Sequence, residues 1–231
     1  MSSDQSVIKQ RYRKLVADIA AAARQSGRNP DEILLLGASK QQPAAAIRVL
    51  AGLGLRDFGE NYVQDALDKQ SELEDLALTW HFIGRIQSNK TRDIARHFHW
   101  VHGVDRVKIA RRLSEQRDAP EPLNLCLQVN IDDEPGKGGL EPGELLDAAQ
   151  IVSGLPNIRL RGLMAIPRPE ADPVRQRAAF RRVRELFQQL RGRDPALDTL
   201  SMGMTADLAA AIAEGATIVR IGTALFGQRP G

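Results

Sequence analysis

The sequence has little cysteine and no long apolar run. Cys126 is the single cysteine, so it cannot form an intramolecular disulfide, and we expect it to be buried within the apolar run 123–129. No apolar run approaches the roughly 18 residues that a membrane-spanning helix needs. Residues 1–6 also lack the pattern of a signal peptide. These absences predict a cytoplasmic protein without membrane contact.

The sequence also lacks any stretch that would divide it into domains. No segment rich in Pro, Gly or Ser and no block of charge lies between residues 33 and 228. A chain of 231 residues, 42% of them hydrophobic, is long enough to bury one large core. We therefore expect a single domain over residues 1–231.

Basic residues are not gathered into a patch. The net charge is +3, but the 32 basic and 29 acidic residues are interspersed along the chain. The densest basic stretch, residues 181–184, is expected on the solvent-exposed face of a helix. Proteins that bind nucleic acids usually cluster such charges on one surface. The sequence therefore predicts no nucleic-acid partner.

Short apolar runs alternate with segments of helical periodicity, after an amphipathic helix predicted for residues 4–26. The runs begin near Ile33, Leu55, Leu78, Trp100, Leu123, Ile158, Thr199 and Thr217. Parallel strands need crossover helices, so this alternation predicts an α/β fold, and eight units favour a closed (β/α)8 TIM barrel. An open doubly wound sheet is the alternative. The turn 37–41 lacks the spaced glycines of a dinucleotide site.

Lys40 ends the first apolar run and has the same strand phase as Leu36 and Ala38. Its side chain is therefore expected in the mouth of the barrel, where barrel enzymes place their chemistry. Apolar walls lower the pKa of a lysine and so make its amine a nucleophile that forms imines. A lysine in solvent at the end of a strand is the alternative.

Two later turns have the composition of phosphate sites. Residues 201–207 place Ser, Gly and Thr before an Ala-rich helix, and residues 220–223 follow the last apolar run. Barrels frequently bind phosphate with the loops after strands seven and eight, although Ser or Thr before a helix is, by itself, more often a plain helix cap. Together with Lys40, the two turns indicate a phosphorylated aldehyde cofactor. Phosphosugar aldolases use similar groups.

A series of motifs lies in order along the chain: Gly37-Ala38-Ser39-Lys40, Phe58-Gly59-Glu60-Asn61-Tyr62, His81-Phe82-Ile83-Gly84, Gln87-Ser88-Asn89-Lys90, Gly162-Leu163-Met164, Leu200-Ser201-Met202-Gly203-Met204 and Val219-Arg220-Ile221-Gly222-Thr223-Ala224-Leu225-Phe226-Gly227. This series resembles the pyridoxal phosphate homeostasis protein family. The resemblance covers roughly residues 33–228. It implies a barrel similar to the N-terminal domain of alanine racemase, with pyridoxal 5'-phosphate (PLP) as the cofactor.

The resemblance also implies roles for individual residues. Lys40 would hold PLP as a Schiff base, and Ser201, Gly222 and Thr223 would lie near its phosphate. Arg220 would face the pyridine nitrogen. A permanently charged guanidinium there disfavours protonation of the ring and weakens it as an electron sink. We predict no catalytic residue and no metal site.

Other positions in the matching motifs complete the predicted cofactor site. Asn61 and His81 either approach the PLP ring or bond to nearby backbone groups. Met164 either packs on the cofactor or belongs to the core. Met202 belongs to the same motif as Ser201 and is predicted as part of the cofactor site with it. Lys137, in a Gly-flanked loop, is a candidate for a second contact, with a solvated lysine as the alternative.

Some positions depart from the family pattern. Gln41 and Gln42 follow Lys40 where Thr and Lys are common, and residues 85–86 read Arg-Ile in place of Pro-Leu. The change at Gln42 puts in doubt any role for a second lysine there. It also removes a positive charge that would lower the pKa of Lys40 further.

The leading hypothesis is a non-catalytic role in PLP homeostasis, in which the protein holds PLP reversibly and passes it to PLP-requiring apo-enzymes. A racemase needs two opposed acid/base groups, and alanine racemases take one of them from a second domain of another subunit. We expect no such domain after Gly231, and we expect a monomer. The alternatives are a small racemase or lyase that uses Lys40 with Tyr62 or His81, and a Schiff-base aldolase.

Overall fold

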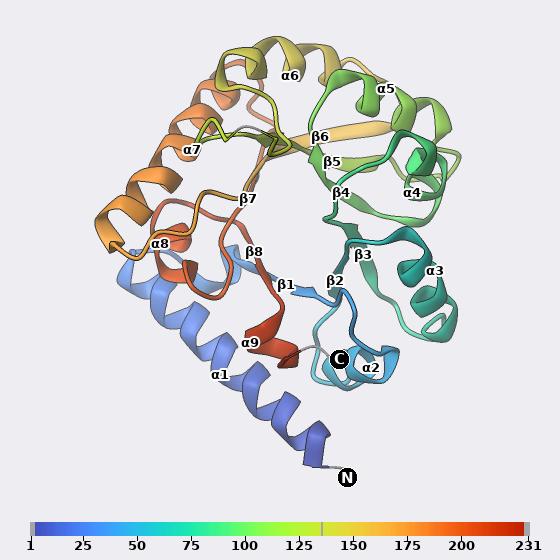
Figure 1. Ribbon diagram of the computed structural model, residues 1–231, viewed down its shortest axis with the longest axis vertical. Coiled ribbons are helices and arrows are strands. Elements are labelled where there is room, and N and C mark those ends of the chain that lie inside the picture. The colour runs from blue at the N-terminus through green and yellow to red at the C-terminus, as the bar shows by residue number, and fades with distance from the viewer. Residues whose placement is uncertain (1–2, 135, 229–231) are drawn as a thin grey trace.

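The computed structural model describes residues 3–134 and 136–228 and contains a closed barrel of parallel strands (Figure 1). Neighbouring strands pair in sequence order, and β1 pairs with β8 to close the barrel. The strands are β1 (Leu34–Ala38), β2 (Asp57–Glu60), β3 (Thr79–Phe82), β4 (Trp100–Val104), β5 (Leu123–Val129), β6 (Ile158–Ala165), β7 (Thr199–Ser201) and β8 (Ile218–Ile221). The predicted single-domain (β/α)8 fold is confirmed, and each strand begins within two residues of its apolar run.

Each strand is followed by a helix of the outer ring (Figure 1). These helices are α2 (Ala44–Ala51), α3 (Val63–Glu72), α4 (Thr91–His97), α5 (Val107–Gln116), α6 (Leu145–Ser153), α7 (Pro173–Arg193), α8 (Leu208–Ala213) and α9 (Thr223–Phe226). Short 3-10 turns occur at Pro30–Glu32, Ser88–Lys90 and Pro142–Glu144. In α5, Ile109 and Leu113 are fully buried while Lys108 and Arg111 are exposed, as expected for an amphipathic helix packed against strands.

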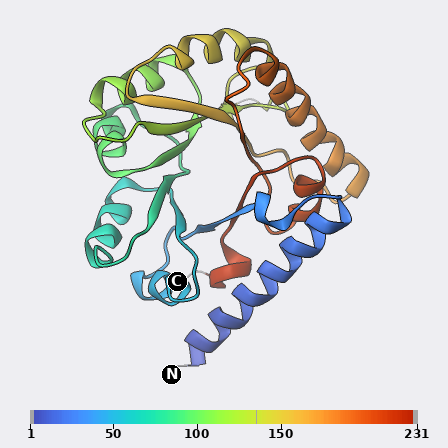
Figure 2. The same ribbon diagram turned by 180° about the vertical axis from the view of Figure 1, so that it is seen from behind.

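The additional helix α1 (Ser3–Gln25) precedes the first strand and lies outside the barrel, against α2, α8 and α9 (Figures 1 and 2). Leu15 and Ile19 are buried against the rest of the core. Arg11 Nη1 donates a 3.0 Å hydrogen bond to the carbonyl of Phe226 in α9. Val7, on the same predicted apolar face, is instead 41% exposed, because the first turns of α1 project beyond the other helices (Figure 1).

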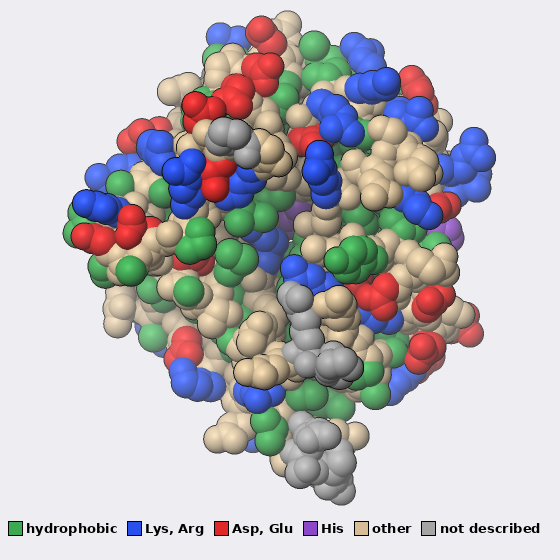
Figure 3. Space-filling model, viewed as in Figure 1, with side chains coloured by type: hydrophobic (Ala, Val, Ile, Leu, Met, Phe, Trp, Pro, Cys, Tyr) green, Lys and Arg blue, Asp and Glu red, His purple; other side chains and the backbone are tan. Residues whose placement is uncertain are grey.

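The surface of the described residues shows no region of a single charge on the face in Figure 3. Acidic and basic side chains lie among one another over most of this face. None of the described helices is long and apolar enough to cross a membrane.

Candidate functional site

A cavity of about 380 Å³ lies where the carboxyl ends of several strands meet. Its wall includes residues that lie one or two positions after a strand: Lys40 after β1, Asn61 after β2, Ile166 after β6, and Gly222 and Thr223 after β8. The residues Met204, Thr205 and Ala206, between β7 and α8, complete one side. Parallel strands bring these chain segments to one end of the barrel, which is where barrel proteins bind ligands. The structure thus brings Lys40 and both predicted phosphate turns to one cavity.

Arg220 lies on β8, with its side chain buried at the wall of this cavity. Its Nη1 donates to the carbonyl and to the Oγ of Ser201, at 2.6 and 2.7 Å, and its Nη2 donates to the carbonyl of Ala165 at 3.0 Å. Burial lowers the pKa of the guanidinium to about 10, so it remains charged at neutral pH. Three protein acceptors therefore hold a positive charge in a fixed orientation beside the cavity.

Two glycines allow the chain to approach the cavity closely. Gly203 has a φ of +95°, and a Cβ there would lie 2.5 Å from the Cβ of Ala211, so the turn after β7 requires glycine. Gly84 lies against Asn61, because a Cβ at Gly84 would be 2.8 Å from the Asn61 Cα.

Asn61 Oδ1 is buried and has no hydrogen-bond partner among the described residues. Since buried acceptors are normally paired, this oxygen is suited to a bound donor.

A charged cluster lies behind Lys40, on the side formed by β1, β2 and α3. Lys69 Nζ donates to the Ser39 carbonyl at 2.9 Å, to Glu60 Oε1 at 2.8 Å and to Asp65 Oδ2 at 2.9 Å. Ser39 Oγ donates to Glu60 Oε1 at 2.6 Å. Burial raises the pKa of Glu60 to about 7, although Lys69 and Ser39 act in the opposite direction. This cluster fixes the backbone of the residue that precedes Lys40.

His81 and Ser201 lie inside the barrel, and neither lines the cavity. His81 Nε2 is 3.0 Å from Asp57 Oδ1, and its Nδ1 is 2.9 Å from His102 Nε2. His102 Nδ1 is in turn 2.7 Å from Ser201 Oγ, which also accepts from Arg220. Both of these predicted site residues therefore connect to the cavity through Arg220.

The two methionines of the predicted site are also buried away from the cavity wall. Met164 on β6 is 2% exposed, and Met202, which follows β7, is fully buried in the main hydrophobic core. Neither lines the cavity that contains Lys40. Met164 pairs in register with Ser201 of β7, and its role toward a cofactor stays a prediction.

A second cavity of about 410 Å³ adjoins the first and shares Asn61 with it. Tyr62, Arg85 and Lys90 also line this second cavity, and Tyr62 is 57% exposed. Tyr62 and His81 are the two residues considered as a second base beside Lys40. Neither belongs to the wall of the Lys40 cavity, since one lines the neighbouring cavity and the other lies within the barrel.

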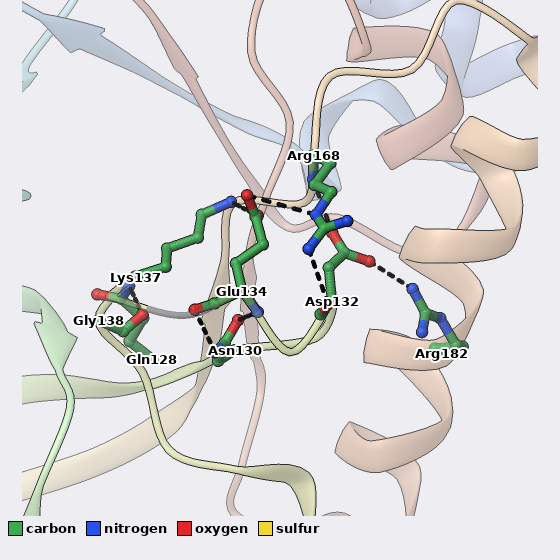
Figure 4. A network of polar contacts seen from close by, with 8 residues as sticks. All are labelled: Gln128, Asn130, Asp132, Glu134, Lys137, Gly138, Arg168 and Arg182. Carbon is green, nitrogen blue, oxygen red and sulfur yellow. Dashed lines mark hydrogen bonds and ion pairs between the residues drawn. The ribbon is translucent and has the colours of Figure 1, made fainter.

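Lys137 lies in the loop after β5 and belongs to a network that joins this loop to α7 (Figure 4). Its Nζ donates to Glu134 Oε1 at 2.5 Å, and Glu134 lies 3.4 Å from the guanidinium of Arg168. Asp132 accepts from the Arg168 backbone N–H at 2.7 Å and pairs with Arg182 of α7 at 2.5 Å. Lys137 is thus ion-paired and not simply solvated, and it does not line the Lys40 cavity.

Sequence reasoning did not identify Glu60, Lys69 or His102 as parts of this region. Lys69 could have been found from its spacing, because it shares the buried face of α3 with Val63 and Ala66. His102 lies two residues after Trp100 on β4 and so shares its side of the strand. The contact between His102 and Ser201 joins residues 99 positions apart, so no local pattern could have indicated it. No cluster of potential metal ligands occurs among the described residues.

Comparison with known proteins agrees with the fold and with the motifs. Residues 12–230 match the family described as alanine racemase, N-terminal domain. The pyridoxal phosphate homeostasis protein of Pseudomonas aeruginosa is 60% identical over 225 residues, covering 97% of this chain and 96% of that protein. The Escherichia coli K12 protein of the same name is 52% identical over 215 residues, covering 91% of this chain and 92% of that protein.

A solved structure of a related protein has the same fold. The structure of PipY from Synechococcus elongatus PCC7942 with PLP bound superposes with a TM-score of 0.80 at 40% identity. The match covers 92% of this chain and 100% of PipY. The chain therefore belongs to the pyridoxal phosphate homeostasis protein family, within the wider group that shares the alanine racemase N-terminal domain.

Proposed function

We propose that this protein binds PLP in the cavity beside Lys40 and holds it reversibly as a Schiff base on that lysine. The single observation that carries the proposal is the meeting of Lys40, Arg220 and the turn at Gly222 and Thr223 on the wall of one cavity. Its volume, about 380 Å³, lies within the range of small-molecule sites. The PLP bound to the related PipY supports the choice of ligand.

The residues present fit the chemical parts of PLP. An aldehyde needs an amine, which Lys40 supplies, and a phosphate needs N–H donors. Thr223 is the first residue of α9, and the first N–H groups of a helix have no partner within the helix. We propose that Gly222 and Thr223 hold the phosphate, that Asn61 accepts from a group on the ring, and that Ser201 contributes by holding Arg220. Met164 and His81 would support the site from the barrel strands, and Met202 from the main hydrophobic core.

Arg220 favours a carrier over an enzyme. Bound PLP can act as an electron sink when its pyridine nitrogen is protonated. A charged guanidinium facing that nitrogen would disfavour protonation, and Arg220 is fixed by Ser201 and Ala165 in a way that keeps its charge beside the cavity. We propose PLP homeostasis without turnover, with transfer to PLP-requiring apo-enzymes in the cytoplasm. We also propose that residues 1–231 act as one monomeric unit that binds no nucleic acid.

The first test is covalent labelling of the lysine. The purified protein is mixed with PLP, its visible absorption spectrum is recorded, and the Schiff base is reduced with borohydride before peptide mapping. We expect the label on Lys40 and its loss in Lys40→Ala. Lys90→Ala is a matched control, because Lys90 is an exposed lysine of the adjoining cavity and its removal should leave the label on Lys40. Label spread over surface lysines in the wild type would contradict the proposal.

The second test separates holding from turnover. The PLP-loaded protein is incubated with a PLP-requiring apo-enzyme, and recovery of that enzyme's activity is compared with recovery in an equal concentration of free PLP. The loaded protein is also given single enantiomers of amino acids. Activation of the apo-enzyme without racemisation is the expected result. Sustained racemisation that disappears in Lys40→Ala would replace the carrier with a racemase.

A further inference from the structure

A line of hydrogen bonds crosses the interior of the barrel and ends at Arg220. Its successive distances are 3.0 Å from Asp57 to His81, 2.9 Å from His81 to His102, 2.7 Å from His102 to Ser201 and 2.7 Å from Ser201 to Arg220. All four lie within the range of ordinary hydrogen bonds. We call these five residues the interior chain.

The interior chain connects the two ends of the barrel. Asp57 is the first residue of β2, and its side chain is 21% exposed. Ser201 is the last residue of β7, and Arg220 lies on the cavity wall. His81 and His102 between them are fully buried, and His81 stacks on Trp100 with ring centroids 5.6 Å apart. The amino-terminal end of the barrel is thus linked to the cavity by buried polar groups alone.

The two ends determine the direction of every hydrogen bond between them. A guanidinium can only donate and an ionised carboxylate can only accept, whereas a neutral imidazole has one donor and one acceptor nitrogen. Burial lowers the pKa of His81 and, more strongly, that of His102, so both rings are neutral at pH 7. If the direction were reversed, His81 Nε2 and Asp57 Oδ1 would be two acceptors facing each other at 3.0 Å.

Only one arrangement of protons satisfies the interior chain. Arg220 donates to Ser201 Oγ, and the Ser201 hydroxyl donates to His102 Nδ1. His102 Nε2–H then donates to His81 Nδ1, and His81 Nε2–H donates to Asp57. Both histidines are therefore Nε2–H tautomers, and the hydroxyl proton of Ser201 points away from the cavity.

We propose that Asp57, His81 and His102 are positioning residues, which orient Ser201 so that it fixes the guanidinium of Arg220 toward a bound ligand. The inference rests on the proposed function, because it assigns the interior chain to the ring-facing arginine of the PLP site. Ser201 and Ala165 take three of the five N–H groups of Arg220. The rest of the guanidinium is thereby held in one orientation, and Ser201 acts through Arg220 without donating to the ligand.

The first experiment tests the proton arrangement without any ligand. The chain has four histidines, so protein labelled with 15N-histidine gives a simple long-range 1H–15N spectrum. We expect His81 and His102 as Nε2–H tautomers, with N–H protons that exchange slowly with water. Asp57→Ala should remove the fixed tautomer of His81, because its Nε2–H loses its acceptor. An Nδ1–H tautomer at either ring in the wild type would overturn the inference.

The second experiment tests positioning. In His102→Leu the Ser201 hydroxyl loses its acceptor, so we expect the Kd for PLP to rise about tenfold, the size of one good hydrogen bond. In His102→Asn the side-chain oxygen can replace Nδ1, so binding should return to within about threefold of the wild type. His99→Gln is the control, because His99 bonds the Trp80 backbone outside the interior chain. If folded His102→Leu binds PLP with the same Kd as the wild type, His102 is not a positioning residue.

The two proposals fail in different ways. If borohydride does not label Lys40, the PLP assignment is wrong, whereas the histidine tautomers are still measured in the ligand-free protein. If Lys40 is labelled but the tautomers differ from those expected, only the interior chain is wrong. If His102→Leu does not fold, Asp57→Ala can be used in its place, because Asp57 is the partly exposed end residue of the interior chain. Its effect on the His81 tautomer is read from the same long-range 1H–15N spectrum.

Discussion

Two sides of the Lys40 cavity are supported by different kinds of buried polar contact. Behind Lys40, the side chain of Lys69 binds Glu60, Asp65 and the Ser39 carbonyl, so charges of both signs lie together. At another part of the cavity wall, which we call the Ser201 side, Arg220 is the single charge of the interior chain that reaches the cavity, and neutral groups connect it to Asp57.

The difference shows how burial acts on titratable groups in two settings. Glu60 has one oxygen paired with Lys69 and Ser39, while its Oε2 has no partner among the described residues, and burial raises its pKa to about 7. The histidines of the interior chain have partners at both nitrogens and burial lowers their pKa values. We therefore expect the Lys69 side to respond to pH between about 4.5 and 7 as Glu60 ionises, and both histidines of the Ser201 side to be neutral at pH 7.

The largest expected effect is on the Lys69 side. Lys69→Met would leave the carboxyl group of Glu60 buried without a cation, and breaking a buried ion pair costs about 3 to 5 kcal/mol of unfolding free energy. Urea unfolding at neutral pH measures this loss. Lys14→Met is a matched control, because Lys14 and Asp18 form an exposed pair with the same four-residue spacing. That variant should lose about 0.5 kcal/mol of unfolding free energy or less. Equal losses in Lys69→Met and Lys14→Met would contradict a larger contribution of the buried pair.

The next effect is a change in pH dependence. A carboxyl group whose pKa is raised on folding stabilises the protein fully below its unfolded pKa, and this contribution is lost as pH rises through the folded pKa. For Glu60 the window runs from about 4.5 to about 7 and corresponds to about 3 kcal/mol. The unfolding free energy of the wild type, minus that of Glu60→Gln, should therefore fall by this amount across the window. A constant difference would contradict the raised pKa.

The smallest effect concerns the Ser201 side. Ser201→Ala would leave His102 Nδ1 buried without a donor, and a buried unpaired group costs about 1 to 3 kcal/mol. Urea unfolding at neutral pH, where burial keeps both imidazoles uncharged, measures this loss. Thr205→Ala changes an exposed hydroxyl of the same cavity and should have little effect. Equal losses in Ser201→Ala and Thr205→Ala would contradict a buried role for the Ser201 hydroxyl.

The position of Lys40 was predictable because it depends on local sequence. The apolar run before it predicts a strand, and strand phase places Lys40 on the same side as Ala38, which also lines the cavity. Gly222 and Thr223 were predicted at the same end of the barrel for the same reason, since both lie within two residues of the end of a strand. The roles of these residues toward PLP remain predictions.

His81 shows where the same reasoning stops. Its motif suggested a strand-end residue that either approaches the ligand or bonds to backbone groups, whereas in the structure its side chain lies within the barrel and contacts Asp57 and His102. Strand alternation only tells which of the two faces of a strand each side chain shares with its neighbours. Only the closure of the barrel determines whether a side chain on one of them meets the cavity or another strand.

The sequence by itself determined the alternation of eight strands with helices, the place of Lys40 at a strand end and the motifs of the family, because these depend on neighbours along the chain. The tertiary structure alone decided that Lys69 pairs with Glu60 behind Lys40 and that His102 reaches Ser201. Contacts of the second kind depend on the register and closure of eight strands. Residues as far apart as 102 and 201 can therefore meet without leaving any local pattern in the sequence.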